Sequence, residues 1–550
     1  MAWIPPRGWR LTLSTRNEVS REPVGPLLPY LQQFLTGDAP SGRGDAEPTR
    51  RGIVLLGAFG SGKTTLSAAL QGPRVVVVPL RLLARGGRLE ERWEKLVGDP
   101  SAVRSGALRV VLDGLDEVAR PGEGGFNGLF EAVTALAGDR WVMTARTGTF
   151  RTSGDRAGHQ QVDALTLSGV ETVEIAPLDL AEVSQALGRQ PASPEICHSP
   201  ILLRLCLEAG LADAPSPAAL VEGWLRWTGC DLDRLTEATW LAYSDRGLSR
   251  ESASFPADAH LGLLADQPLD RLMVRDADGL LRFGHRSLYD FLVARHLTPW
   301  IAGNQGGKPN AASGLHISEA MRIFLAGLVP QPEARGDADW VEVPSGNYVS
   351  GGEHSPDERP LLIHHLERPC LLARRPVSEG AIARWLEAEG PRPPGYWFLR
   401  HWAGAAHPPA GTEGNPAYHL RPDDADAYAA WAGGRLPTWR EWEKGARGIS
   451  GRRWPWGDRA DGASVNTAER AAWRPLPPEE TGIQGPTGLY CAAGDVFEVT
   501  SDWYHGREDR GRVVMGGSYA HDVKVARAGL RLSHTLSGNL KVGMRLARDG

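Results

Sequence analysis

GIVLLGAFGSGKTTL, residues 52–66, sets the fold of the first half of this 550-residue chain. The apolar run at its start predicts a buried strand, and the segment after it has the spacing Gly-x-x-x-x-Gly-Lys-Thr of a phosphate-binding loop that opens a helix. Glycines let backbone N–H groups turn inward around phosphate oxygens, while the lysine reaches the β- and γ-phosphates and the threonine binds Mg²⁺. A chance glycine-rich turn is disfavoured by the strand before the motif and the helix after it. The residues expected around the nucleotide are Gly57, Gly60, Ser61, Gly62, Lys63, Thr64 and Thr65.

Three further apolar runs follow along the chain: RVVVVPL at 74–80, RVVLDGL at 109–115 and RWVMTAR at 140–146. Helical stretches separate these runs. Continuous apolar strands that alternate with helices are typical of a parallel sheet covered on both faces. We therefore expect an α/β domain of the P-loop NTPase class in this part of the chain.

Charged residues follow the ends of two of these strands. Asp113 ends its apolar run, where it can hold the water shell of the Mg²⁺ bound to Thr64. Asp116 and Glu117 then remain to polarise the attacking water, and Arg146 leaves the same edge of the sheet, where it can sense the γ-phosphate. A solvated acidic loop and a plain surface arginine are the alternatives. We expect ATP or ADP with Mg²⁺ as cofactors, although the motifs do not separate ATP from GTP.

Length, charge and cysteine spacing narrow the class of protein. A chain of 550 residues exceeds one ordinary core, so we expect two to four domains. The net charge of −5 gives no electrostatic reason to expect nucleic acid or an anionic membrane as a partner. No run of about 18 apolar residues is present and the first residues do not form a secretion signal, so the cytoplasm is the expected location. Five scattered cysteines indicate neither a disulfide framework nor a zinc site.

Changes in composition mark the domain boundaries. The run GDAPSGRGDAEPTRR at 37–51 reads as a linker or mobile loop, and the segment before it is too short for an effector enzyme, so we expect any effector to be a separate protein. Helical spacing dominates from Leu178 to Ala334, and after Asp337 the chain is rich in Trp, Gly and Pro. We expect an N-terminal segment and linker at 1–48, an NTPase domain at 49–190, a helical domain at 191–250, a winged-helix-like domain at 251–336 and a C-terminal domain at 337–550.

The paired-acid segment LDGLDE at 112–117, with an arginine ending the next strand, resembles the NACHT branch of the STAND class of signal-transduction NTPases. Pro200, in HSPILL, matches the proline that lies against the adenine in that family. His285, in FGHRSLYDFLVARHL, matches the winged-helix histidine that approaches the β-phosphate of ADP; a histidine that satisfies the core or caps a helix is the alternative. The resemblance, over residues 50–335, implies a switch that ADP holds closed, that assembles into homo-oligomers after exchange for ATP, and that slow hydrolysis resets.

The C-terminal part contains, in order, the stretches WVEVPSGNYVSGG, RRPVSEGAIARWL, AGGRLPTWREWEKGARG, WPWGD, GDVFEVTSDWY, VVMGGSY and VGMRLA. Over residues 338–550 they resemble the formylglycine-generating enzyme (sulfatase-modifying factor) domain, which implies an α+β variant of the C-type lectin fold. Active members of that family oxidise a substrate cysteine with copper held by two cysteines shortly after the Gly-Gly-Ser turn. His521 and Ala526 stand near those positions, and no cysteine follows Cys491. Because soft Cu(I) needs thiolate ligands, we expect the oxidase activity to be absent.

A second departure from that family lies in GDVFEVTSDWY. Asp495 and Val499 stand where the family usually has Asn and Trp. We expect the fold to survive both changes. The changes imply that the ion or packing network near Glu498 and Asp502 is altered.

The end of the chain also resembles the variable proteins of diversity-generating retroelements. These are non-catalytic copies of the fold, whose diversified codons lie between the Gly-Gly-Ser turn and the last strand. The polar, irregular series between Ser518 and Val542 suits an adaptable binding surface, and an ordinary solvated loop is the alternative. The candidate ligand contacts are Tyr519, His521, Asp522, Lys524, Leu530, Leu532, His534, Leu536, Asn539 and Lys541.

Three hypotheses on function follow. In the first, the C-terminal domain senses a ligand, a protein or another macromolecule, and the NTPase converts binding into an assembled state; a role in bacterial defence or signalling follows by family analogy. In the second, the protein is a formylglycine-generating-type oxidase with a regulatory NTPase. In the third, the C-terminal domain is only a structural cap on an NTPase.

Overall fold

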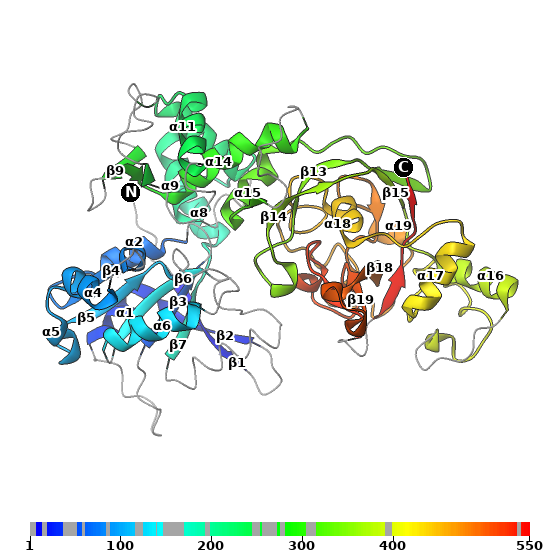
Figure 1. The fold of residues 1–550 in the computed structure, drawn as a ribbon, viewed down its shortest axis with the longest axis horizontal. Helices are drawn as coiled ribbons and strands as arrows, with labels where there is room; N and C mark the ends of the chain where they lie inside the picture. Colours follow the sequence, from blue (N-terminus) through cyan, green and yellow to red (C-terminus); the bar gives the residue numbers. More distant parts are fainter. Residues whose placement is uncertain are drawn as a thin grey trace, which may run out of the picture. The chain divides into compact units, whose positions relative to one another are not determined.

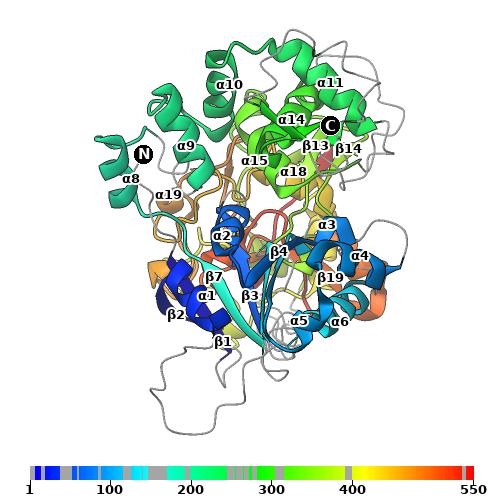
Figure 2. The same ribbon diagram turned by 90° about the vertical axis from the view of Figure 1, so that its left-hand side faces the viewer.

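The structure is a computed structural model, and the chain divides into two compact units, Met1–Tyr289 (unit 1) and Asp290–Gly550 (unit 2) (Figures 1 and 2). The structure describes residues 7–13, 19–36, 52–57, 61–83, 88–115, 125–138, 140–146, 170–192, 199–244, 254–255, 264, 272–275, 281–303, 315–390, 399–535 and 541–550. None of the helices in these ranges is both long and apolar enough to cross a membrane.

Unit 1 is built on a seven-stranded sheet in the order β2-β1-β7-β3-β6-β5-β4. The strands are β1 Arg7–Leu13, β2 Val19–Pro26, β3 Gly52–Gly57, β4 Val75–Pro79, β5 Arg109–Asp113, β6 Trp141–Arg146 and β7 Val170–Ile175. The four strands predicted from apolar runs are confirmed as β3 to β6, and with β7 they are parallel. The sheet is mixed because the hairpin of β1 and β2, which the sequence analysis did not predict, joins it antiparallel to β7.

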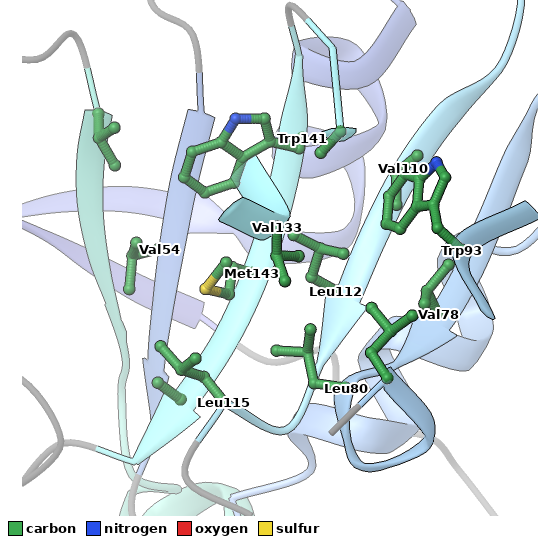
Figure 3. Packing of buried hydrophobic residues seen from close by; sticks show 14 of the residues in the cluster. Val54, Val78, Leu80, Trp93, Val110, Leu112, Leu115, Val133, Trp141 and Met143 are labelled. Atoms are coloured by element: carbon green, nitrogen blue, oxygen red, sulfur yellow. The ribbon is translucent and has the colours of Figure 1, made fainter. Parts of the chain in front are cut away.

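Helices cover both faces of this sheet, as apolar parallel strands require. The helices are α1 Leu27–Thr36, α2 Lys63–Leu70, α3 Leu80–Leu83, α4 Leu89–Val97, α5 Pro100–Arg104 and α6 Gly125–Leu136. Alternate strand residues face opposite sides: Ile53 packs with α1 and α2, whereas Val54 packs with the cluster that contains α3 to α6 (Figures 2 and 3). Trp93 and Trp141 fill that second layer. Each such buried side chain contributes about 1.5 to 3 kcal/mol of hydrophobic stabilisation.

The remainder of unit 1 is mainly helical, as the apolar spacing predicts. Its helices are α8 Leu180–Leu187, α9 Pro200–Ala209, α10 Pro217–Trp227 and α11 Leu232–Ser244, and α14 Arg286–Ile301 begins in it. Three short strands form a small antiparallel sheet: β8 Ser254–Phe255, β9 Met273–Arg275 and β10 Leu281–Phe283. Tyr289 at the start of α14 packs against Tyr243 of α11 and Phe283 of β10, which ties this sheet to the helices.

Unit 2 is an α+β structure of short strands around a few helices (Figure 1). Its main strands are β11 Leu315–His316, β12 Trp340–Val343, β13 Gly346–Ser350, β14 Leu362–Leu366, β15 Cys370–Ala373, β16 Ile483–Gln484, β17 Leu489–Tyr490, β18 Phe497–Trp503, β19 Arg512–Met515, β20 Leu532–Ser533, β21 Val542–Met544 and β22 Ala547–Asp549. Its helices are α15 Glu319–Leu328, α16 Glu379–Glu389, α17 Pro422–Trp431, α18 Trp439–Arg447 and α19 Pro478–Thr481.

Helix α18 forms the centre of unit 2. It begins with a capping box of Thr438 and Glu441 and packs against β12, β13, β15, β18 and β19. Four of its charged residues, Glu441, Glu443, Lys444 and Arg447, are buried, and they have partners: Arg447 donates to Glu443 at 2.9 Å, and Lys444 Nζ donates to the carbonyl of Gly346 at 3.0 Å. Charges are buried at such positions only when they are paired, so the polar residues of α18 fix its place among the strands.

Candidate functional site

The phosphate-binding motif lies between strand β3 and helix α2, where the sequence predicts it. Gly57 ends β3, and Lys63 begins α2 directly after Gly62. The Nζ of Lys63 donates to the carbonyl of Gly57 at 2.8 Å, so the lysine side chain turns back to the end of β3. The Oγ of Ser61 is buried but has no hydrogen-bond partner among the described residues, and it is therefore a polar group that a phosphate oxygen would satisfy. The motif thus fits a bound phosphate.

Two glycines of the motif are required by its geometry. A β-carbon at position 57 would lie 2.3 Å from Oγ of Ser61 and 3.0 Å from Cγ of Lys63. Gly62 has a φ of 88°, in the left-handed region that side chains disfavour. Thr64 and Thr65 follow on the first turn of α2 and are exposed, so their hydroxyls are open to solvent. A side chain is therefore disfavoured at both glycines that flank the undescribed part of the loop.

Asp113, the expected Mg²⁺ residue, ends strand β5 and is buried. Its Oδ1 accepts hydrogen bonds from Oγ of Ser67 on α2 at 2.9 Å and from Oγ1 of Thr144 on β6 at 2.7 Å. The hydroxyl of Thr144 also accepts from the backbone N–H of Gly114 at 2.9 Å. These hydroxyls hold the carboxylate next to the helix that carries the phosphate loop. The sequence analysis missed Ser67 and Thr144, whose only signal is a polar residue inside an otherwise apolar pattern.

Pro200 comes from a distant part of the sequence but lies against the phosphate loop. It occupies the first turn of α9, after the N-cap residue Ser199. A β-carbon at position 62 would lie 3.8 Å from Cγ of Pro200, which is van der Waals contact. The structure thus brings this proline to the loop, as the assignment of Pro200 to the nucleotide requires.

His285 precedes helix α14 and caps it. Its Nδ1 accepts from the backbone N–H of Ser287 at 3.1 Å and lies 2.5 Å from Oγ of the same serine. Burial lowers the pKa of His285 to about 4, with further lowering by Lys63 and Arg204. The neutral ring therefore carries its proton on Nε2, because Nδ1 is an acceptor. His285 combines the capping role with a position close enough to Lys63 for their charges to interact.

The depressed pKa of His285 predicts a pH dependence of stability. The unfolded chain takes up this proton near pH 6.5 and the folded protein only near pH 4. The contribution of His285 to the free energy of unfolding should therefore be complete above pH 6.5. It should decrease by at most about 3 kcal/mol as the pH drops to 4. Denaturant titrations across this range test it. His285→Asn, which can still accept from Ser287, should lose part of the slope, and His407→Asn at an exposed histidine should keep it. Equal slopes in both variants would contradict the assignment.

Some predicted residues have no described side chain. Gly60, Asp116, Glu117, Leu536 and Asn539 lie outside the described residues. The backbone of Arg146 ends β6 directly opposite Gly57, the last residue of β3, so its Cα is at the sheet edge of the phosphate loop; its side chain lies outside the described part. The roles of these six residues stay predictions.

In unit 2, the segment after the Gly-Gly-Ser turn is tightly packed. Gly517 has a φ of 74°, and a β-carbon there would lie 2.9 Å from Cβ of Ala526. Nδ1 of His521 lies 2.7 Å from Oγ of Ser518, and its ring is edge-on to Phe497. Within the described residues, no group of three or more His, Cys, Asp or Glu side chains is arranged to hold a metal ion. His521, a hydrogen-bonded imidazole, and Ala526, a buried methyl group, are the residues near the positions at which the family resemblance expects thiolates.

Glu498 belongs to a buried ion pair. Arg545 donates to both of its carboxylate oxygens, at 2.9 and 2.7 Å, and Trp442 Nε1 donates to it at 2.7 Å. Asp502 accepts from the backbone N–H of Trp439 at 2.6 Å, and burial raises its pKa. This is a packing network that holds β18 to the last strands and to the start of α18.

Asp495 is fully buried and lies between loops. Its Oδ1 accepts from Nδ2 of Asn466 at 2.6 Å and from the backbone N–H of Leu476 at 3.0 Å. Burial raises its pKa. The carboxyl group therefore joins the loop before α19 to the start of β18.

The candidate ligand residues of unit 2 differ in exposure. Asp522 and Lys524 are exposed, whereas Tyr519 and Leu530 are buried at 6% exposure each. The others that the structure describes are half-buried: His521, Leu532, His534 and Lys541. A ligand touching Leu530 would have to displace other residues, so the accessible members of this set are Asp522, Lys524 and the half-buried side chains.

Comparison with known proteins identifies similarity in the C-terminal part. The family described as the Sulfatase-modifying factor enzyme 1-like domain matches residues 326–550. The formylglycine-generating enzyme of Streptomyces coelicolor is 36% identical over 194 residues, which cover 28% of this chain and 61% of that relative, less than two thirds of its length. The hercynine oxygenase of Mycolicibacterium smegmatis is 30% identical over 297 residues, which cover 43% of this chain and 67% of that relative.

Two solved structures are distant matches. Variable protein 1 of Treponema denticola has 16% identity and a TM-score of 0.31, and it covers 40% of this chain and 99% of its own. A STAND ATPase with a tetratricopeptide-repeat sensor from Pyrococcus horikoshii has 15% identity and a TM-score of 0.25, with 51% and 45% covered. TM-scores this low say nothing about the function of this chain.

Proposed function

The chain belongs, through residues 326–550, to the family of Sulfatase-modifying factor enzyme 1-like domains. We propose that the whole chain is a nucleotide-dependent switch, in which unit 1 binds the nucleotide and the C-terminal domain recognises a ligand without oxidising it. The ligand would be a protein or another macromolecule. Binding would allow ADP to be exchanged for ATP in unit 1, followed by assembly and a signal to a separate effector. Slow hydrolysis would reset the switch.

The observation that carries the proposal is the convergence on the phosphate loop. Lys63 and the buried, unsatisfied Ser61 offer groups for phosphate, and Asp113 lies bonded to the same helix, where it would hold Mg²⁺ with Thr64. His285 is electrostatically close to Lys63. A bound Mg²⁺ nucleotide would supply the negative charge that these groups lack. His285, a neutral donor at Nε2, would contact a diphosphate differently from a triphosphate, which is what a two-state switch needs.

The absence of oxidation is supported by the segment after the Gly-Gly-Ser turn. His521 and Ala526 stand near the positions at which the family resemblance expects thiolates, and Gly517 lies close against Ala526. A soft metal would find no thiolate pair there. Diversification of the positions from Tyr519 to Lys541 by a retroelement, and a role in bacterial defence or signalling, are part of the proposal by family analogy.

Nucleotide exchange and assembly test the switch. The full chain is loaded with a fluorescent ADP analogue, and its release into excess ATP is followed with the oligomeric state measured by light scattering. Release followed by a larger species that forms with ATP and not with ADP supports the proposal. Assembly that does not depend on which nucleotide is bound would contradict the proposal of a nucleotide-dependent switch.

Copper content and cysteine oxidation test the alternative, a formylglycine-generating-type oxidase with a regulatory NTPase. The protein is incubated with Cu(I) and a cysteine-containing peptide, and both bound copper and peptide oxidation are measured. We expect neither stoichiometric copper nor turnover. Clear oxidation of the peptide would favour the oxidase and would contradict the proposal that unit 2 is non-catalytic.

A further inference from the structure

Four polar side chains of unit 2 form a continuous chain of contacts. Lys541 Nζ lies 3.2 Å from Nε2 of His419, and Nδ1 of His419 lies 3.3 Å from Nδ1 of His401. Nε2 of His401 lies 2.6 Å from Oε1 of Glu379, whose other oxygen accepts from the indole N–H of Trp402. The chain runs from a half-buried ammonium to a carboxylate that is only 2% exposed.

The direction of every hydrogen bond in this chain follows from its two ends. The ammonium group of Lys541 only donates, so Nε2 of His419 accepts from it and the proton of the neutral His419 ring is on Nδ1. Nδ1 of His419 therefore donates to Nδ1 of His401, which leaves Nε2 of His401 to donate to Glu379. Burial, then Lys541 and His401, lower the pKa of His419 to about 3, which keeps this ring neutral. The hydrogen-bonded series of His419, His401 and Glu379 thus fixes the position of the Lys541 ammonium group.

The charges around Lys541 are not balanced. Lys541 forms no ion pair with any residue in the described part of the chain. The pKa of Lys541 is lowered mainly by burial and further by the charge of Arg400, which is exposed. The one carboxylate of the cluster, Glu379, is engaged by His401. Neither neighbouring segment, 391–398 or 536–540, contains an Asp or Glu. A half-buried cation without an anionic partner is costly, and an anion would relieve that cost.

The backbone at this place is strained, and aromatic rings line it. His419, Leu399 and Ala403 have φ values of 58°, 44° and 53°, in the left-handed region that non-glycine residues disfavour. Tyr418 stacks on His401 with ring centroids 3.8 Å apart and meets Tyr519 edge-on at 6.0 Å. Such strain persists only where the surroundings over-determine it, and it clusters at ligand sites.

Tyr519 belongs to the same cluster as Lys541. The ammonium of Lys541 lies 5.9 Å from the centre of its ring. Burial and Tyr418 raise the pKa of Tyr519, so its hydroxyl stays protonated. His521 also belongs here, because the charge of Lys541 contributes to lowering its pKa. The cluster therefore lies next to His521, which stands near the positions at which the family resemblance expects thiolates.

We infer that Lys541, held by the chain through His419 and His401 and flanked by Arg400, binds an anionic group, a carboxylate or a phosphate, of the ligand recognised by unit 2. The inference rests on the proposed role of unit 2 in ligand recognition. It names the chemistry of that recognition: the ammonium group forms a charge-assisted hydrogen bond with the anion.

Small anions serve as probes of this site. All measurements use the full chain carrying Lys63→Ala, so that phosphate does not report on the nucleotide loop. Acetate, inorganic phosphate and neutral acetamide are titrated at constant ionic strength, and the unfolding temperature is recorded. We expect a saturable rise with acetate, phosphate or both, and none with acetamide. The response to acetate against phosphate distinguishes the two anion classes.

Variants locate the response. Lys541→Met should weaken the anion affinity about ten- to a hundredfold, because it removes a charge-assisted hydrogen bond. Lys541→Arg, which keeps the charge, should retain a response, and Lys95→Met at an exposed lysine of unit 1 should match the parent. The inference is overturned if the parent shows no saturable response to either anion, or if Lys541→Met binds as tightly as the parent.

The two proposals fail separately in these experiments. An anion response that needs Lys541, together with a failed nucleotide-exchange test, would leave the anion site standing and remove the switch. Normal nucleotide-dependent assembly without an anion response would remove only the anion site. Should Lys541→Met not fold, the parent titration and Lys541→Arg still decide the outcome.

Discussion

Replacing Lys63 by alanine is expected to abolish tight nucleotide binding. The ammonium is held at the end of β3 by its hydrogen bond to the carbonyl of Gly57, and the motif assigns it to the β- and γ-phosphates. Charge-assisted hydrogen bonds contribute roughly 1.5 to 3 kcal/mol each, so losing two of them lowers the affinity at least about a hundredfold. Equilibrium titration with fluorescent ADP and ATP analogues in the presence of Mg²⁺ measures the loss.

A matched control separates this effect from a general change of charge. Lys95 lies in the last turn of α4, is exposed, and is remote in sequence from the loop. Lys95→Ala should bind nucleotide as the parent does. The unfolding temperature of both variants without nucleotide shows whether the fold is intact. Affinity retained by a folded Lys63→Ala variant would refute the assignment of the phosphate loop.

Replacing Arg545 by methionine is expected to give the largest loss of stability in unit 2. The guanidinium is fully buried, pairs with Glu498, and donates to the carbonyls of Ala373, Arg374 and Tyr490 at 2.7 to 2.9 Å. Removing it leaves a buried carboxylate with too few partners, which costs about 3 to 5 kcal/mol of unfolding free energy. Denaturant unfolding of the full chain, followed by tryptophan fluorescence, measures the change.

Two further variants define the origin of that loss. Arg507→Met removes an exposed arginine that pairs with Asp509, and it should cost at most about 1 kcal/mol. Combining Arg545→Met with Glu498→Leu removes both charges, so the double variant should be more stable than Arg545→Met alone. A double variant no more stable than the single one would show that the carbonyl contacts, and not the unpaired carboxylate, dominate.

The positions of the central strands of unit 1 could be predicted because the local sequence alone determines that these segments form buried strands. Four-residue apolar runs such as Ile53 to Leu56 have little alternative to a buried strand. Strand β7 and the β1–β2 hairpin were not predictable in this way. Strand β7 carries Glu171, which is buried only because Arg10 of β1 donates to it at 2.5 Å and Tyr30 of α1 at 2.6 Å. A partner 161 residues away in sequence is invisible to a local pattern.

The candidate sites show the same division. The phosphate loop is one continuous motif, so its residues and the need for Gly57 and Gly62 follow from the sequence. Pro200 and His285 were found only through a family resemblance, because nothing local marks them. The contacts of His401 and His419 with Glu379 and Lys541 had no sequence signal, since these residues come from segments far apart in the sequence and meet only through tertiary packing.

The β1–β2 hairpin has a practical consequence for work with shortened forms of this protein. A truncated form that begins at strand β3 would leave β7 as an open edge, with a row of unpaired backbone groups available to another molecule. Glu171 would at the same time lose Arg10, the positive charge that compensates it. Such a form would tend to self-associate through its sheet, so any assembly it shows would have to be distinguished from assembly driven by nucleotide.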